Sequence, residues 1–162
     1  MFIQQMDLFP GMARDFVKRV LDITARETIP EGAVIFGQGD PADYFYILLK
    51  GRIRLTIGED GHSVYVVSKP GEAFGWSSLL GRKYYSASAQ CMEETRLLRM
   101  EKTKLQEILD KDPINGLIFF KKLSGILGNR LLQIYQMISS APEADSSRSY
   151  GSGQTMQPSE PD

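Results

Sequence analysis

The sequence is poor in the residues from which most catalytic and metal sites are built. Its 162 residues contain one histidine, His62, and one cysteine, Cys91, without a carboxylate pair, a Cys/His ligand set or a phosphate-binding glycine loop. A single cysteine forms no intramolecular disulfide, and its position in a predicted strand indicates a buried thiol, as expected in a reducing cytoplasm. His62 lies beside a Glu-Asp-Gly turn and is predicted to be a surface residue. The sequence therefore predicts no enzyme and no metal site.

An excess of one charge and long apolar runs are also missing. Lys and Arg number 19 against 20 Asp and Glu, and the net charge is −1. A near-neutral chain gives no general attraction to nucleic acid or to an anionic membrane. There is no apolar run of about 18 residues, and the N-terminus lacks the basic start and apolar core of a signal peptide. We expect a cytoplasmic single domain with no membrane partner and no nucleic-acid partner.

What the sequence does contain is a series of short strand patterns. Residues 26–100 hold about seven or eight short runs rich in Ile, Val, Tyr and Leu, separated by turn-forming sequences such as Gly-Asp-Pro and Glu-Asp-Gly. Evenly spaced short strands, with one over residues 44–49 and a hairpin turn at residues 58–61, are typical of antiparallel rolls and sandwiches. Residues 11–23 have apolar side chains at helical spacing and predict an amphipathic helix. The predicted fold class is α+β: an antiparallel, jelly-roll-like β-roll of about eight strands, with an N-terminal helix and a long C-terminal helix.

Two helices are predicted after the roll. Thr103 and Gln106 have the spacing of a capping box, which predicts the start of a short helix. Asp112 followed by Pro113 predicts the start of a second helix, over residues 113–138. Residues 139–162 contain seven Ser, three Pro and two Gly and are predicted to be disordered. The predicted domain therefore covers residues 1–138 and includes the second helix.

Apolar residues follow two stripes on the second helix. The first has heptad spacing and predicts a homodimer; its members are Leu117, Phe120, Ser124, Leu127, Leu131, Ile134 and Ile138. The second is predicted to pack on the chain's own roll and consists of Phe119, Leu123 and Ile126. The alternative is one wide stripe buried within the monomer. Gly116, Gly125 and Gly128 weaken a helix interior, which indicates a bend or the close approach of another helix.

An uncommon pattern of glycines, aspartate and apolar residues runs from Glu31 to Arg54. Glycine supplies the positive φ of tight turns, and aspartate closes a turn through its side chain. The pattern resembles the signature of the cyclic-nucleotide-binding domain family, which includes catabolite-activator-type transcription factors and regulatory subunits of kinases. The positions that match are Gly32, Ile35, Gly39, Asp40, Ala42, Phe45 or Tyr46, Ile47, Gly51 and Ile53.

This resemblance implies a ligand pocket in a phosphate-binding cassette. In the family, a glutamate of the cassette holds the ribose and an arginine pairs with the cyclic phosphate. Here Trp76 takes the glutamate position and Tyr85 the arginine position, while Glu72 precedes the cassette and is predicted to have a turn role. The ligand-binding residues that the resemblance implies are Phe74, Gly75, Trp76, Ser77, Ser78, Leu79, Arg82, Tyr85, Ser86, Ala87 and Ser88.

The two replaced positions leave two interpretations open. Trp76 and Tyr85 either line a slot for a cyclic nucleotide or another small anionic or aromatic ligand, or they fill a pocket that no longer binds one. Arg82 either brings positive charge to an anion or is a solvated loop residue. No cofactor is certain. Losing the carboxylate and the guanidinium predicts weak binding of cyclic nucleotides.

The resemblance therefore implies a non-enzymatic regulatory or sensor domain with an altered ligand pocket. The alternative is a dimerisation and interaction module that regulates a partner protein and whose pocket no longer binds a ligand. The resembled transcription factors carry a helix-turn-helix domain after the long helix. Because residues 139–162 are too few for such a domain, we expect no DNA binding by that route.

Overall fold

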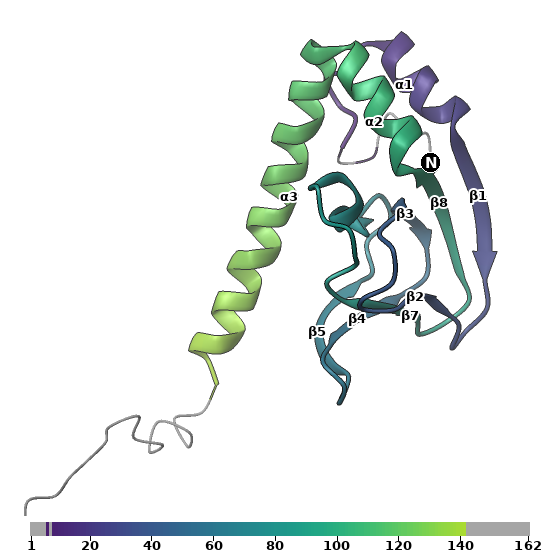
Figure 1. Ribbon diagram of the computed structural model, residues 1–162. Helices are drawn as coiled ribbons and strands as arrows, with labels where there is room; N and C mark the ends of the chain where they lie inside the picture. Colours follow the sequence, from purple (N-terminus) through teal and green to yellow (C-terminus); the bar gives the residue numbers. More distant parts are fainter. Residues whose placement is uncertain (1–5, 7, 142–162) are drawn as a thin grey trace, which may run out of the picture.

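The computed structural model describes residues 6 and 8–141, and most of the predicted disordered segment, residues 142–162, lies outside the described part (Figure 1). Three α-helices, eight strands and one short 3₁₀ helix are described. In chain order they are α1 (Arg14–Asp22), β1 (Thr24–Ile29), β2 (Val34–Phe36), β3 (Tyr44–Lys50), β4 (Ile53–Ile57), β5 (His62–Val67), β6 (Ala73–Phe74), η2 (Trp76–Leu79), β7 (Ser88–Cys91), β8 (Thr95–Glu101), α2 (Lys102–Lys111) and α3 (Pro113–Ser139).

The strands form two four-stranded sheets with the orders β1-β8-β3-β6 and β2-β7-β4-β5. All of their pairings are antiparallel. The exposed turn at residues 58–61 joins β4 to β5, where the sequence predicts a hairpin. Figure 1 shows α1 and α2 at one end of the roll and α3 running down its side. The predicted α+β fold, a β-roll with an N-terminal helix and a long C-terminal helix, is confirmed.

Strand β3 contributes to two separate parts of the core. Phe45 and Ile47 belong to a buried cluster with residues of the three helices. Tyr46 and Leu48 belong to a second cluster inside the roll, which both sheets contribute to. Successive side chains of a strand point to opposite faces, so one strand serves both clusters. Burial of such side chains is the main force that holds the helices on the roll.

Helix α3 packs on the roll through the stripe that was predicted to do so. Phe119 and Leu123 are fully buried, and Ile126 packs against the same cluster. The Phe119 ring lies 6.1 Å from the Phe45 ring and 6.3 Å from the Phe9 ring, measured between centroids. Fully burying a side chain of this size contributes roughly 1.5–3 kcal/mol. These contacts fix which side of α3 faces the roll.

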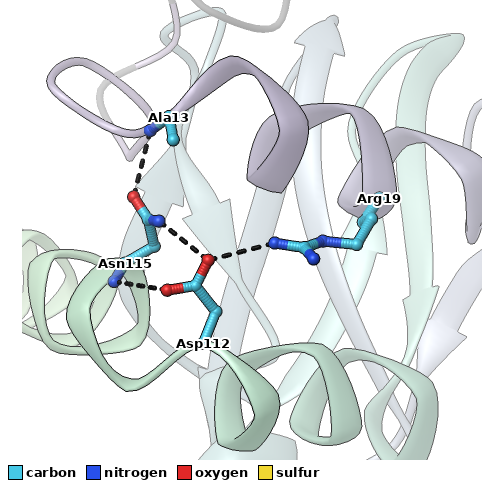
Figure 2. Close-up of polar contacts among 4 residues, drawn as sticks. All are labelled: Ala13, Arg19, Asp112 and Asn115. Carbon is cyan, nitrogen blue, oxygen red and sulfur yellow. Dashed lines mark hydrogen bonds and ion pairs between the residues drawn. The ribbon is translucent and has the colours of Figure 1, made fainter.

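Polar contacts at Asp112 fix the start of α3 (Figure 2). The Asp112 carboxylate accepts hydrogen bonds from the backbone N–H of Asn115 at 3.2 Å and from its Nδ2 at 2.8 Å. It also accepts one from Nη2 of Arg19 on α1, at 3.0 Å. In turn, Oδ1 of Asn115 accepts from the N–H of Ala13, the N-cap of α1, at 3.0 Å. The predicted cap at Asp112 is confirmed, and the same group joins α3 to α1.

The start of α2 differs from the sequence prediction. The helix begins at Lys102 with Glu101 as its N-cap, so Thr103 lies inside the first turn. Its hydroxyl donates to the Glu101 carboxylate at 2.8 Å and does not cap the helix.

The presence of glycine at position 116 of α3 has a local explanation, because a Cβ there would lie 2.8 Å from the Leu109 carbonyl oxygen. Close approach of α2 to α3 at their corner therefore requires a glycine.

Candidate functional site

A cavity of about 310 Å³ lies between the β-roll and α3. This is the lower end of the volume range of small-molecule sites. Its wall includes six residues of the predicted ligand set, Gly75, Trp76, Ser77, Tyr85, Ser86 and Ala87. The rest of the apolar wall comes from β2, β4, β5 and α3, through Phe36, Leu55, Ile57, Val64 and Ile134.

Gly75 sets the direction in which the cassette enters the cavity wall. Its φ is +72°, a left-handed conformation that glycine adopts without strain. A Cβ at this position would also lie 2.8 Å from Cδ2 of Tyr46. Glycine is thus required both for the turn and for the close approach to β3. The turn presents Trp76 and Ser77 to the cavity, and Oγ of Ser77 lies 3.3 Å from Oγ of Ser86.

Tyr85 is tightly fixed within the wall. Its hydroxyl accepts a hydrogen bond from the N–H of Tyr44 at 3.0 Å and donates one to the Tyr44 carbonyl at 2.7 Å. Its ring stacks on Phe36, with centroids 3.8 Å apart and an interplanar angle of 15°. Burial raises the pKa of the Tyr85 hydroxyl above its ordinary value, which keeps it neutral. The group at the family's arginine position is therefore an uncharged wall residue.

The other predicted ligand residues lie elsewhere. Phe74 is buried in the cluster inside the roll, where its ring stacks on Tyr46 at 5.0 Å. Ser78, Leu79 and Arg82 line a different cavity, of about 580 Å³, beside α2. Ser88 lies in β7, and its hydroxyl accepts from the N–H of Gln38 at 2.8 Å. The structure therefore divides the predicted set between two cavities, the core and, for Ser88, strand β7.

Arg130 of α3 is the functional candidate that the sequence interpretation missed. It lines the 310 Å³ cavity, and only 7% of its surface is exposed. Its Nη2 donates to the Ala73 carbonyl at 2.9 Å, and its guanidinium lies 4.3 Å from the centroid of the Tyr65 ring. Nε and Nη1 are buried without a hydrogen-bond partner among the described residues. It is the one charged residue in the wall of this cavity as far as the chain is described.

A signal for Arg130 is present in the sequence. The stripe Phe119, Leu123 and Ile126 continues at helical spacing to Arg130, and this stripe was predicted to face the roll. An arginine at the end of an apolar stripe either stays at the surface or enters a polar site, because arginine is almost never buried without a partner. The position of Arg130 on this stripe is therefore the signal from which it could have been found.

Glu72 and Tyr65 form a polar group next to Arg130. The Tyr65 hydroxyl donates to Oε1 of Glu72, and Oε2 of Glu72 accepts from the N–H groups of Ser68 and Lys69. Burial, together with the hydrogen bond to Glu72, raises the pKa of Tyr65 above its ordinary value. The predicted turn role of Glu72 is confirmed, and its carboxylate oxygens are both occupied.

The predicted dimerisation residues are divided by the packing of α3. Phe120 and Leu127 pack against the chain's own helical core cluster. Ile134 lines the cavity. Leu117 and Leu131 are exposed, by 58% and 46%. Only part of the first stripe is thus available to a second molecule.

Within residues 6 and 8–141, none of the helices combines the length and apolar character needed to cross a lipid bilayer. In the same part of the chain, His, Cys, Asp and Glu residues form no group of three or more suited to a metal ion.

Comparisons with known proteins identify relatives across most of the chain. Residues 26–112 match the family model described as the cyclic nucleotide-binding domain. The chain is 32% identical over 127 residues to the cyclic AMP receptor protein of Thermus thermophilus, which covers 76% of this chain and 56% of that protein. It thus spans about half the length of this curated relative, and 27% of a potassium channel protein of Rhodopseudomonas palustris that it matches at 22% identity.

Solved structures similar to this chain include proteins of the same kind. The catabolite activator protein of Thermus thermophilus superposes with a TM-score of 0.66 at 29% identity, over 82% of this chain and 62% of that one. A cyclic nucleotide-binding domain from Methylobacillus flagellatus superposes with a TM-score of 0.72 at 21% identity, over 84% of this chain and 78% of that one. At this identity the second comparison supports the fold alone.

Proposed function

Because the chain belongs to the cyclic nucleotide-binding domain family, whose domains are non-enzymatic sensors, we propose that it senses a small ligand through a pocket that differs from the family pattern. One observation carries this proposal. The cavity wall contains Trp76 and Tyr85 where the resembled pattern has a glutamate and an arginine, and the described wall includes no carboxylate.

The size of the expected effect follows from the two missing groups. A hydrogen bond to a charged group contributes roughly 1.5–3 kcal/mol. Losing both the ribose carboxylate and the phosphate guanidinium should weaken cyclic nucleotide binding by about 3–6 kcal/mol. This corresponds to roughly a hundred- to ten-thousand-fold in affinity, so a micromolar ligand would bind only marginally.

Calorimetry with cyclic AMP and cyclic GMP tests the proposal. Cyclic AMP is the first ligand to titrate, since the Thermus thermophilus relative is named as its receptor. We expect no saturation below about 100 μM for either nucleotide. Saturation at or below about 1 μM would show that the two replaced positions do not matter for binding. Native mass spectrometry of the protein purified from its source should reveal a retained small molecule of another kind.

A second candidate function, a homodimer that regulates a partner protein, is favoured by the exposed side of α3. Exposed apolar residues repeat there at heptad spacing, and we call this set the α3 seam: Ile114, Leu117, Leu131, Tyr135 and Ile138. Ser124 and Gly128 lie between them at the same spacing, and a Cβ at Gly128 would meet nothing within 4 Å. Such a stripe suits a second copy of the same helix.

A further inference from the structure

Arg130 is buried without the partner that a buried arginine normally has. In the described part of the chain it forms no ion pair, and three of its N–H groups, one on Nε and two on Nη1, make no hydrogen bond. Burying a charge is costly unless it is paired and hydrogen-bonded. The bond to Ala73 and the stacking on Tyr65 satisfy only part of this requirement.

The neighbouring carboxylate, that of Glu72, does not pair with the charge of Arg130. Glu72 bonds to Tyr65 and to two backbone N–H groups, and it is not within ion-pair distance of Arg130. The Tyr65 hydroxyl donates to Glu72 and makes no hydrogen bond to Nε or Nη1 of Arg130. Arg130 therefore brings an uncompensated positive charge to the wall of the cavity.

The rest of the wall narrows the chemistry of a ligand. It is aromatic and aliphatic around Trp76, Val64 and Ile134, and its side-chain hydroxyls without a backbone or carboxylate partner are those of Ser77 and Ser86. Such a surface suits a flat apolar body with one anionic group. A nucleotide carries ribose hydroxyls and ring nitrogens that would lose their hydrogen bonds to water against this wall.

We propose that the cavity binds a compact aromatic carboxylate whose anionic group pairs with Arg130 of α3. This rests on the proposed function, since it names the ligand of that same altered pocket. A single carboxylate neutralises the single charge of the wall, and guanidinium groups match carboxylates in geometry. Nε and Nη1 are shielded from water, so the carboxylate reaches them after a rotation of the guanidinium or of the Tyr65 ring.

Trp76 provides a direct readout, because it is the only tryptophan of the chain and it lines the cavity. Phenylacetate and its neutral analogue phenylacetamide are titrated into the full chain, and the fluorescence of Trp76 is followed. We expect a saturable change with phenylacetate and roughly ten- to hundred-fold weaker binding of phenylacetamide, the effect of one charge-assisted hydrogen bond. Benzoate and cyclic AMP are titrated in parallel.

Two variants separate the role of Arg130 in binding from a structural role. Arg130→Met keeps an unbranched side chain and removes the charge, so it should bind phenylacetate and phenylacetamide equally. Arg96→Met, at an exposed position of β8 outside the cavity wall, is the matched control and should keep the preference for the acid. Circular dichroism and thermal melting check that both variants fold. If Arg130→Met does not fold, Arg130→Lys, which keeps the charge, should retain a preference for phenylacetate.

The outcomes distinguish this inference from the proposed function. Equal binding of acid and amide by the wild type overturns the role of Arg130 and leaves an altered pocket in place. Absence of saturable binding by both phenylacetate and benzoate overturns the ligand class. Tight binding of cyclic AMP, with Trp76 responding, overturns the proposed function itself.

Discussion

The hydroxyl of Tyr85 bonds to both backbone groups of Tyr44, accepting from the N–H at 3.0 Å and donating to the carbonyl at 2.7 Å. These two bonds tie the end of the cassette loop to the start of β3. One side chain thus takes the place of a pair of sheet hydrogen bonds next to the cavity.

Tyr85→Phe tests this connection. The ring can keep its stacking on Phe36, while the N–H and carbonyl of Tyr44 lose their partner. A polar group left unsatisfied costs about 1–3 kcal/mol, and we expect a loss of this size in the free energy of unfolding, measured with urea. Tyr84→Phe is the control, because Tyr84 is 57% exposed and should have almost no effect. Equal stability of Tyr85→Phe and the wild type would contradict the role given to this hydroxyl.

The double variant Trp76→Glu with Tyr85→Arg tests how far the pocket differs from the family pattern. Restoring both charged groups should strengthen cyclic AMP binding tenfold or more, as measured by calorimetry. The variant should also be less stable than the wild type, because Tyr85→Arg removes the stacking on Phe36 and the bonds to Tyr44. An unchanged affinity in a variant that still folds would indicate that positions 76 and 85 do not face the ligand.

The α3 seam predicts the oligomeric state. At tens of micromolar, light scattering should give the mass of a dimer for the wild type. Replacing Leu117 and Leu131 by lysine would bury unpaired charge in the seam and should give a monomer. Gln133→Lys adds the same kind of charge to an exposed position outside the seam and should remain dimeric. A monomeric wild type under these conditions would exclude this interface.

The contacts of Asp112 predict a dependence of stability on pH. Hydrogen bonds from Asn115, with a smaller contribution from Arg19, lower the pKa of this carboxyl below its ordinary value. A depressed pKa stabilises the fold above the unfolded value of about 3.9, and that stability is lost as the pH falls through the folded value. Asp112→Asn should be less stable than the wild type at pH 7, and thermal melting should show the difference shrink as the pH falls below about 4 and disappear below the folded pKa. A difference that persists at low pH would mean that the ionised carboxylate is not its origin.

The strands of the roll could be predicted because turns and apolar alternation are local properties. The expected strand over residues 44–49 is β3, at Tyr44–Lys50, and the hairpin at residues 58–61 joins β4 to β5. The cap at Asp112 could be predicted for the same reason, because the neighbouring Pro113 lacks a backbone N–H and favours the first helical position. The capping box at Thr103 failed because the N-cap is Glu101, two residues earlier, which spacing alone does not determine.

The wall of the cavity could be predicted only in part. In the 3₁₀ helix η2 about three residues complete a turn, so neighbouring residues point in different directions. Ser77 therefore lines the cavity, while the Ser78 hydroxyl turns back and donates to the Gly75 carbonyl at 2.8 Å. The position of Arg130 in the cavity wall depends on how α3 packs against the roll. That packing is determined by the contacts of Phe119 with residues far away in the sequence.

The buried position of Cys91 affects how this protein can be labelled. The side chain is 2% exposed, and burial raises the pKa of its thiol, so the reactive thiolate is scarce at neutral pH. A maleimide dye should therefore not react with the native chain and should attach to a cysteine introduced at an exposed site outside the α3 seam, such as position 133. In the native chain, Cys91 reacts only when the roll opens, so the rate of its modification measures how often the roll opens.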